Sequence, residues 1–240
     1  MNNTPSQTPK TLIIWDYNGT LINDGDIWAR ASQNFYKELN LNFTSRQIRE
    51  AYDTPISKMI YTLTGSSLEE FDDTLLQNAK DAFRETVDHY TPFVKPRGGI
   101  PDILYEFQQT GFRQIVASNH QQDLLTAEIE QAGIEAYFDL ISGRKGEDEI
   151  FQKTTKGNRI ITCVGKLEQL TEQRFKHIFL IGDSPEEARL RDEIKQSGLL
   201  IRSIGFNGGF STPEVMEKAG HDAIINNANE LPEKIRVLSC

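Results

Sequence analysis

The feature that most constrains the fold is the stretch Thr11–Leu21, which reads TLIIWDYNGTL. Its apolar run, residues 12–15, has the length and composition of a buried strand. Asp16 follows directly, and the pair Asn18-Gly19 then predicts a turn. In open α/β sheets, ligands bind at the carboxyl ends of the strands. The stretch therefore predicts a buried strand whose end presents an acid to a ligand.

Further apolar runs alternate with helical patterns in the second half of the chain. We expect strands at residues 112–117, 138–141, 177–181, 199–204 and 223–225. We expect helices at about 103–111, 124–132 and 166–175, and from Glu186 onward. Residues 160–164 fit either a short strand or an irregular buried run, and residues 143–157 show no clear pattern. Strands separated by helices predict an α/β fold, a doubly wound parallel sheet with helices on both faces.

Residues 22–95 interrupt this alternation. Apolar side chains recur there at helical spacing, without a strand pattern, and predict about four helices. The segment is too long for an ordinary connection between strands. We therefore expect a small all-helical cap domain at 22–95, inserted into a core domain of residues 8–21 and 96–240. The Pro- and Gly-rich turn at 96–101 marks the expected return to the core.

Composition narrows the classes of partner. A chain of 240 residues can hold one large domain or a core with an insert, and its net charge of −9 argues against nucleic acid or anionic membranes. No apolar run reaches the roughly 18 residues that a membrane span needs, and residues 1–10 lack the apolar centre of a signal peptide. Cys163 and Cys240 do not suggest a disulfide framework. We expect a cytoplasmic monomer or homodimer.

Two acids follow two of the expected strands. Asp16 follows the first strand, and Asp183 follows the strand at 177–181. Neighbouring parallel strands lie about 4.8 Å apart, so the two carboxylates could converge on one cation. Mg²⁺ prefers oxygen ligands, commonly one or two carboxylates with water and phosphate. The alternative is that each Asp only caps the helix after it. Two acids at matching strand ends favour the metal site.

These motifs resemble those of the haloacid dehalogenase-like (HAD) phosphohydrolases. The first stretch is similar to the family pattern Asp-x-Asp-Gly-Thr-Leu, with Asn18 in place of the second Asp. Ser118, at the end of the second strand, resembles the second motif, and Asp183 with Glu187 resembles the fourth. Residues 216–226 are similar to the last sheet unit of the family. The likeness spans nearly the whole chain and is greatest to the phosphoglycolate phosphatase-like subgroup, which carries a helical cap after the first strand.

The resemblance implies a magnesium-dependent phosphatase that acts on a small phosphorylated metabolite. Asp16 would be the nucleophile and would form an aspartyl-phosphate, which divides one hard displacement into two steps. Asp16, the main-chain carbonyl of Asn18, and Asp183 would hold the metal ion. Glu187 would support the metal shell or orient a lysine.

The resemblance also implies a phosphate-binding set. Ser118 would donate a hydrogen bond to a phosphoryl oxygen, beside Asn119, and the turn at Gly19 would offer amide hydrogens to the anion. The family needs a lysine next to the nucleophile. Lys166 is favoured, because it opens a predicted helix before the fourth strand. The alternatives are Lys145, Lys153 and Lys156.

Asn18 departs from the family at the position of its general acid and base. An amide cannot exchange a proton in this way, and such catalysis is typically worth about 10²–10⁴-fold in rate. The chain could act on substrates with good leaving groups, be a weak or specialised phosphatase, or bind ligands or partners without turnover. Dehalogenation at carbon, or phosphonate cleavage through Lys37 or Lys58 of the cap, fits less well. The retained Asp16, Ser118 and Asp183 favour an active enzyme.

The cap is expected to select the substrate and exclude water. Asn23, Asp24 and Asp26 lie near the expected hinge. Acids there would disfavour a second anionic group on the substrate, or would cap the next helix. Tyr17 could line the pocket or pack against the cap, and Trp28 is expected in the core.

Overall fold

A single parallel sheet organises the chain. The computed structural model describes residues 10–52, 56–91, 94–146 and 156–240. The strands are β1 (Thr11–Trp15), β2 (Arg113–Gln121), β3 (Leu140–Arg144), β4 (His177–Gly182), β5 (Ile201–Phe206) and β6 (Ala223–Ile225). They pair in the order β3-β2-β1-β4-β5-β6, and every pairing is parallel. This order confirms the predicted doubly wound α/β fold.

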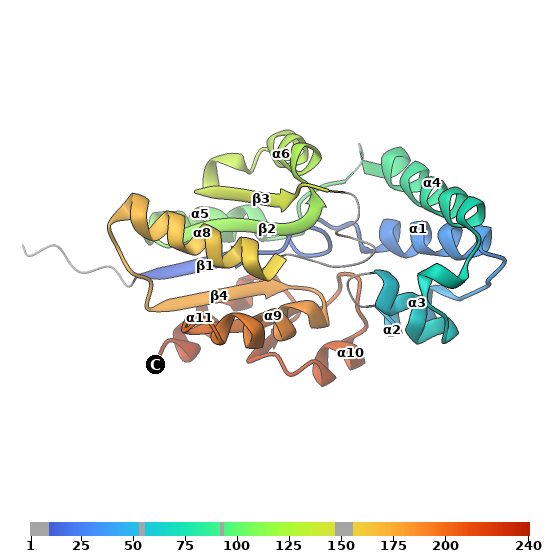
Figure 1. Cartoon of the computed structure of the whole chain (residues 1–240). Helices are drawn as coiled ribbons and strands as arrows, with labels where there is room; N and C mark the ends of the chain where they lie inside the picture. The colour runs from blue at the N-terminus through green and yellow to red at the C-terminus, as the bar shows by residue number, and fades with distance from the viewer. Residues whose placement is uncertain (1–9, 53–55, 92–93, 147–155) are drawn as a thin grey trace, which may run out of the picture.

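Helices cover both faces of the sheet (Figure 1). On one face lie α5 (Ile100–Gln109), α6 (Gln122–Gln131) and α11 (Leu231–Leu238), and on the other lie α8 (Lys156–Thr171) and α9 (Pro185–Lys195). The shorter α10 (Pro213–Lys218) connects β5 to β6, and single 3-10 turns lie at Glu135–Tyr137 and Ala228–Glu230. Alternate β1 side chains enter the two apolar clusters: Ile13 and Trp15 face the first group of helices, and Leu12 and Ile14 face the second. The strand is buried on both faces, as expected for a parallel sheet.

One expected element is wrong. Residues 160–164 lie inside α8, which also begins ten residues before the helix expected at 166–175. Ile160, Val164 and Leu167 are buried against the sheet. Their spacing is that of one helix face, so an apolar run that resembles a strand is here the buried side of a helix. Residues 147–155, within the unassigned segment 143–157, lie outside the described part of the chain.

The described residues of the expected cap segment form helices, whose apolar cluster also includes Phe210 from the core. These are α1 (Gly25–Glu38), α2 (Ser45–Glu50), α3 (Ile56–Thr64), a 3-10 turn η1 (Leu68–Glu70) and α4 (Asp73–Tyr90). Thr44 caps α2 by accepting a hydrogen bond from the amide of Gln47, and Asp72 caps α4. A capping box formed by Ser67 and Glu70 begins the turn η1. The cap helices lie beyond the carboxyl ends of the strands (Figure 1).

The chain leaves and re-enters the core at one place. Ile22 and Pro96 form an isolated antiparallel bridge, and the amide of Asn23 donates to the carbonyl of Lys95 at 3.1 Å. We propose that these adjacent segments are the hinge between a cap of residues 22–95 and the rest of the chain. None of the helices in the described ranges is long and apolar enough to cross a membrane.

Candidate active site

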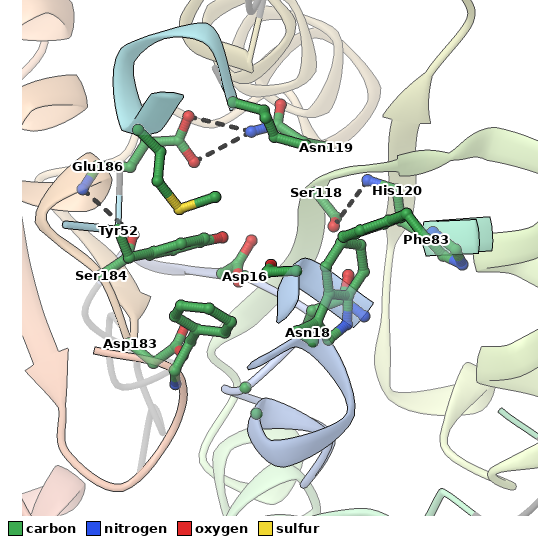
Figure 2. Close-up of a pocket in the computed structure, with 17 residues that line it drawn as sticks. Asp16, Asn18, Tyr52, Phe83, Ser118, Asn119, His120, Asp183, Ser184 and Glu186 are labelled. Carbon is green, nitrogen blue, oxygen red and sulfur yellow. Dashed lines mark hydrogen bonds between the residues drawn. The ribbon is translucent and has the colours of Figure 1, made fainter. Parts of the chain in front are cut away.

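Asp16 and Asp183, directly after the ends of β1 and β4, meet Ser118 of β2 in one pocket (Figure 2). Strand β2 runs on to Gln121, so Ser118 lies within the strand and not at its end, where it was expected. Strand β1 lies between β2 and β4, and its last residue, Trp15, pairs with Val116 on one side and Ile181 on the other. Asp16 comes one residue later, at the point where the strand order reverses. Doubly wound sheets bind their ligands at this switch point.

Lys156 is the lysine next to Asp16. Its ammonium lies 2.7 Å from Oδ1 of Asp16, 2.8 Å from Oε1 of Glu187 and 3.2 Å from Oε2 of Glu186. The side chain is 1% exposed, so these contacts are shielded from solvent. Burial alone would lower the pKa of Lys156, but the three carboxylates outweigh it and hold this pKa well above its usual value. Lys156 is therefore a buried cation.

The preference for Lys166 is thus corrected. Lys166 is exposed on α8, while Lys156 is the first residue of that helix and points into the site. Gly157 follows Lys156, and Gly165 precedes Lys166, so that each of the two lysines, ten residues apart, has a glycine neighbour. The sequence alone does not show which of the two lysines begins the helix and reaches the site, because the start of α8 depends on packing against the sheet. Lys145 is exposed, and Lys153 lies outside the described residues.

Burial and neighbouring acids raise the pKa values of Asp16 and Asp183. Burial raises the pKa of Asp16 well above its usual value; Lys156 opposes this, and Glu187 and Asp183 add to it. Burial likewise raises the pKa of Asp183 to about 7. Loss of hydration and like charge both disfavour the ionised carboxylates. The site therefore carries excess negative charge that a cation would neutralise.

Backbone encloses the carboxylate of Asp183. Its Oδ2 accepts a hydrogen bond from the amide of Phe210 at 2.5 Å, and its Oδ1 lies 3.4 Å from the hydroxyl of Thr20. A Cβ atom on either Gly19 or Gly209 would lie 2.1 Å from Oδ2. Both positions therefore need glycine for the chain to approach the carboxylate this closely.

The oxygen donors suit a hard divalent cation. Within the described ranges, no three His, Cys, Asp or Glu side chains form a complete metal cage. Magnesium does not need one, because it keeps several waters and binds through one or two carboxylates and the substrate phosphate. Asp16 and Asp183 supply two carboxylates, and the charge of Asp183 raises the pKa of Asp16. The residues present therefore fit magnesium.

Glu187 and Glu186 are engaged by protein groups. Glu187 binds Lys156 through Oε1 and accepts a hydrogen bond from the Ser184 hydroxyl at Oε2, at 2.9 Å. Both oxygens of Glu187 are thus held by protein groups, which places Glu187 to orient the lysine. Its expected contribution to the metal shell stays a prediction. Glu186 shares the same ammonium and was missed at the sequence level, where only one acid was expected to follow Asp183.

Asn18 is held by a buried acid. Its Nδ2 donates to Oδ2 of Asp24 at 2.6 Å, and the indole of Trp28 donates to the same oxygen at 2.8 Å. Asp24 is at the N-cap position of α1, but its side chain makes no cap hydrogen bond. Because an ionised carboxylate only accepts, the atom of Asn18 that faces Asp24 must be the nitrogen. The Asn18 oxygen is therefore turned away from Asp24.

The expected phosphate-binding residues divide into two groups. The Ser118 hydroxyl accepts a hydrogen bond from the amide of His120 at 3.1 Å, which leaves its hydrogen for a ligand. In contrast, the amide of Gly19 donates to Oδ1 of Asp24 at 2.6 Å. The Asn119 side chain donates to both oxygens of Glu186 (Figure 2). Ser118 is therefore available to a phosphate, whereas these groups of Gly19 and Asn119 already have protein acceptors.

The opposite wall of the pocket is mostly apolar. It is lined from the cap by Trp28, Ser32, Tyr52, Ile56, Met59 and Phe83, and from the core by Phe210. The rings of Tyr52 and Phe210 lie 4.1 Å apart, and those of Trp28 and Phe83 lie 5.3 Å apart. Trp28, expected in the core, is thus part of the pocket wall, while Tyr17 is buried and stacks on His120.

Solved structures share this fold over nearly its whole length. A predicted phosphatase from Clostridium acetobutylicum superposes with a TM-score of 0.73 at 20% identity, covering 95% of this chain and 99% of that one. A haloacid dehalogenase-like family hydrolase from Streptococcus pneumoniae gives a TM-score of 0.70 at 17% identity, covering 95% and 99%. At these identities the likeness establishes the fold.

Sequence comparison agrees with the likeness in fold. A phosphoglycolate phosphatase from Aquifex aeolicus is 30% identical over 141 residues, which are 55% of this chain and 60% of that protein. The chain thus matches less than two thirds of that relative's length. The family model described as haloacid dehalogenase-like hydrolase matches residues 13–189, which include the ends of β1, β2 and β4. The chain therefore belongs to the haloacid dehalogenase-like hydrolase family.

Proposed function

We propose that this protein is a magnesium-dependent phosphatase that hydrolyses a small phosphomonoester through an aspartyl-phosphate on Asp16. The strongest support is the 2.7 Å contact between Lys156 and Asp16 at the sheet's switch point. A buried ammonium next to a strand-end carboxylate can neutralise an incoming phosphate and hold the nucleophile in place. The approaching phosphoryl group would otherwise meet only negative charge.

The first step is the attack of Asp16 on phosphorus. Lys156 occupies Oδ1, so Oδ2 is the nucleophile. The bond from Oδ2 to phosphorus forms as the bond from phosphorus to the leaving oxygen breaks, and the electron pair goes to the leaving group. Ser118 donates a hydrogen bond to a phosphoryl oxygen, and the buried charge of Lys156 offsets the negative charge of the phosphoryl group. Asp16, the main-chain carbonyl of Asn18, and Asp183 would hold magnesium, which when bound neutralises charge on the transferring group.

Water then cleaves the aspartyl-phosphate, releasing inorganic phosphate and restoring Asp16. Asn18 cannot remove a proton from this water, but its oxygen, turned away from Asp24, can accept a hydrogen bond and orient it. The enzyme should therefore be slower than one with an acid at this position, by about 10²–10⁴-fold where proton transfer limits the rate. We propose that Glu187 orients Lys156.

The direct test is hydrolysis of p-nitrophenyl phosphate, whose leaving group needs little help from an acid. Turnover that requires magnesium and is lost in Asp16→Ala is the expected result. Absence of turnover on this substrate and on a metabolite panel, with phosphate binding intact, would instead indicate a binding protein that keeps the fold.

A further inference from the structure

We propose that the natural substrate is an aryl phosphate, the phosphate ester of a phenol, with no second anionic group. This rests on the phosphatase function proposed above and specifies its substrate class. Two separate features support it: the composition of the cap wall and the amide at position 18.

The cap wall provides a place for an aromatic ring. Tyr52 and Phe210 form one ring pair on the wall, and Trp28 and Phe83 form another. Ile56 and Met59 add aliphatic surface. Figure 2 shows Tyr52 and Phe83 on either side of the space in front of Asp16. A planar leaving group between these side chains would gain ring contacts and bury apolar surface.

The same wall offers no counterion for a charged leaving group. In the part of the chain that the structure describes, no lysine or arginine side chain lines this wall. Arg49 lies beside it, 5.4 Å from the centre of the Phe210 ring, but donates to the carbonyls of Gly209 and Phe210 and to Asp26. A carboxylate on the substrate would be desolvated there without a partner, and close to the acids of the site.

The amide of Asn18 selects by the chemistry of the leaving group. An alcohol holds its proton about as tightly as water, with a pKa of about 15.7, so its ester needs an acid for cleavage. A phenol has a pKa of about 10 and can leave as the phenolate. Asp24 does not replace the missing acid, because both its oxygens accept hydrogen bonds from Asn18, Gly19 and Trp28.

An aryl phosphate satisfies both features. Small acyl phosphates have good leaving groups but no ring to pack against the aromatic wall. Apolar alkyl phosphates can pack against the wall but have poor leaving groups. In an aryl phosphate, Oδ2 of Asp16 displaces a phenolate, which takes the bonding electron pair and then a proton from solvent. Water next releases inorganic phosphate from Asp16, so the net products are a phenol and phosphate.

The test compares substrates that separate ring, leaving group and charge. We expect phenyl phosphate to have the highest kcat/KM. Benzyl phosphate, which has the ring but an alcohol leaving group, should lose about 10²–10⁴-fold in kcat/KM. Acetyl phosphate should keep kcat and have a raised KM. Phosphoglycolate should be poor in both constants.

Charge is tested by a matched pair, 4-carboxyphenyl phosphate and its methyl ester. We expect the free acid to have a kcat/KM at least about tenfold lower, the ratio that corresponds to 1.4 kcal/mol. Met59→Lys, which places a cation on the wall, should shrink that ratio. Tyr61→Lys, at a position 64% exposed on the same helix, should leave it unchanged.

Two results would overturn the substrate class while leaving the phosphatase function intact. One is a kcat/KM for phosphoglycolate or the free acid that equals or exceeds that of phenyl phosphate. The other is equal kcat/KM for benzyl and phenyl phosphate. If no substrate shows turnover that depends on both magnesium and Asp16, the phosphatase function itself fails, and the substrate class fails with it.

Discussion

The side chain of Asn18 donates a hydrogen bond to the buried carboxylate of Asp24, at 2.6 Å. Asp24 is 5% exposed, and burial raises its pKa to about 6. The position that carries an acid in the family motif is therefore paired with an acid six residues later. Restoring the family residue at position 18 alone would place two carboxyl groups in contact.

We accordingly predict that Asn18→Asp destabilises the fold. Two carboxylates in contact disfavour ionisation, and the hydrogen bonds of a buried acid are lost, which together cost about 1–3 kcal/mol. The double variant Asn18→Asp, Asp24→Asn exchanges the two groups and should recover most of this loss. Urea unfolding at pH 7.5 measures both variants. A single variant as stable as the wild type would show that the Asn18 contact is dispensable.

The same double variant tests the catalytic role of position 18. An acid there can protonate a leaving alkoxide and activate water, whereas phenolates need little help. We predict a gain in kcat/KM, which reports the step that expels the leaving group, of about 10²–10⁴-fold on benzyl phosphate and a much smaller gain on p-nitrophenyl phosphate. Equal gains on both substrates would contradict this explanation of Asn18.

Lys156 and Lys166 provide a matched pair on one helix. Lys156→Met removes the cation that contacts three carboxylates, so we predict loss of activity by at least about 10²-fold and of stability by about 3–5 kcal/mol. Lys166→Met changes an exposed side chain and should alter stability by no more than about 0.5 kcal/mol. Steady-state kinetics and chemical unfolding compare the two. Comparable effects would refute the assignment of Lys156.

Magnesium binding should depend on Asp183. Asp183→Asn removes one of two carboxylates that fit the ion, and we expect it to weaken magnesium binding by at least about tenfold. Titration calorimetry without substrate measures this apart from turnover. Asp123→Asn, on the exposed side of α6, is the control and should bind as the wild type does. Unchanged affinity in Asp183→Asn would place the metal elsewhere.

His221 should make stability depend on pH. Burial is the main cause that lowers its pKa in the folded state; the charge of Arg191 adds to this, while Glu187 and Asp222 oppose it. Below a pH of about 6.5 the unfolded chain therefore binds a proton that the folded chain does not. This stability is fully present above that pH and is lost as the pH falls towards the lowered pKa. The difference in unfolding free energy between wild type and His221→Gln should shrink from pH 8 to pH 5. A difference that stays constant would show that His221 does not cause the pH dependence.

The sequence predicts the sheet and the two strand-end acids well, because both follow from local pattern. Asp16 and Asp183 each end a short apolar run, and parallel strands bring such ends together. The prediction for residues 160–164 was wrong because a run rich in β-branched residues fits either a strand or one face of a helix. Packing against the sheet determines which of the two forms.

The finer contacts of the site depend on side-chain directions that spacing does not reveal. Lys156 reaches Asp16 because α8 begins at that residue, beside the site. Asp24 resembles a helix cap in sequence, yet its side chain turns to Asn18 and Gly19. Phe210 reaches the cap wall from a loop of the core. Each of these contacts depends on how the folded chain positions its segments and side chains, which the sequence pattern does not show.

The central claim is covalent catalysis by Asp16, and Asn18 makes it directly observable. Because an amide cannot activate the hydrolytic water, the second step should be slow, and the aspartyl-phosphate should accumulate with p-nitrophenyl phosphate and magnesium. Rapid acid quenching and peptide mass spectrometry measure the adduct. We predict a burst of p-nitrophenol together with a phosphoryl group on the peptide that contains Asp16, both absent in Asp16→Asn. Steady turnover without an adduct, or an adduct that persists in Asp16→Asn, would contradict the account.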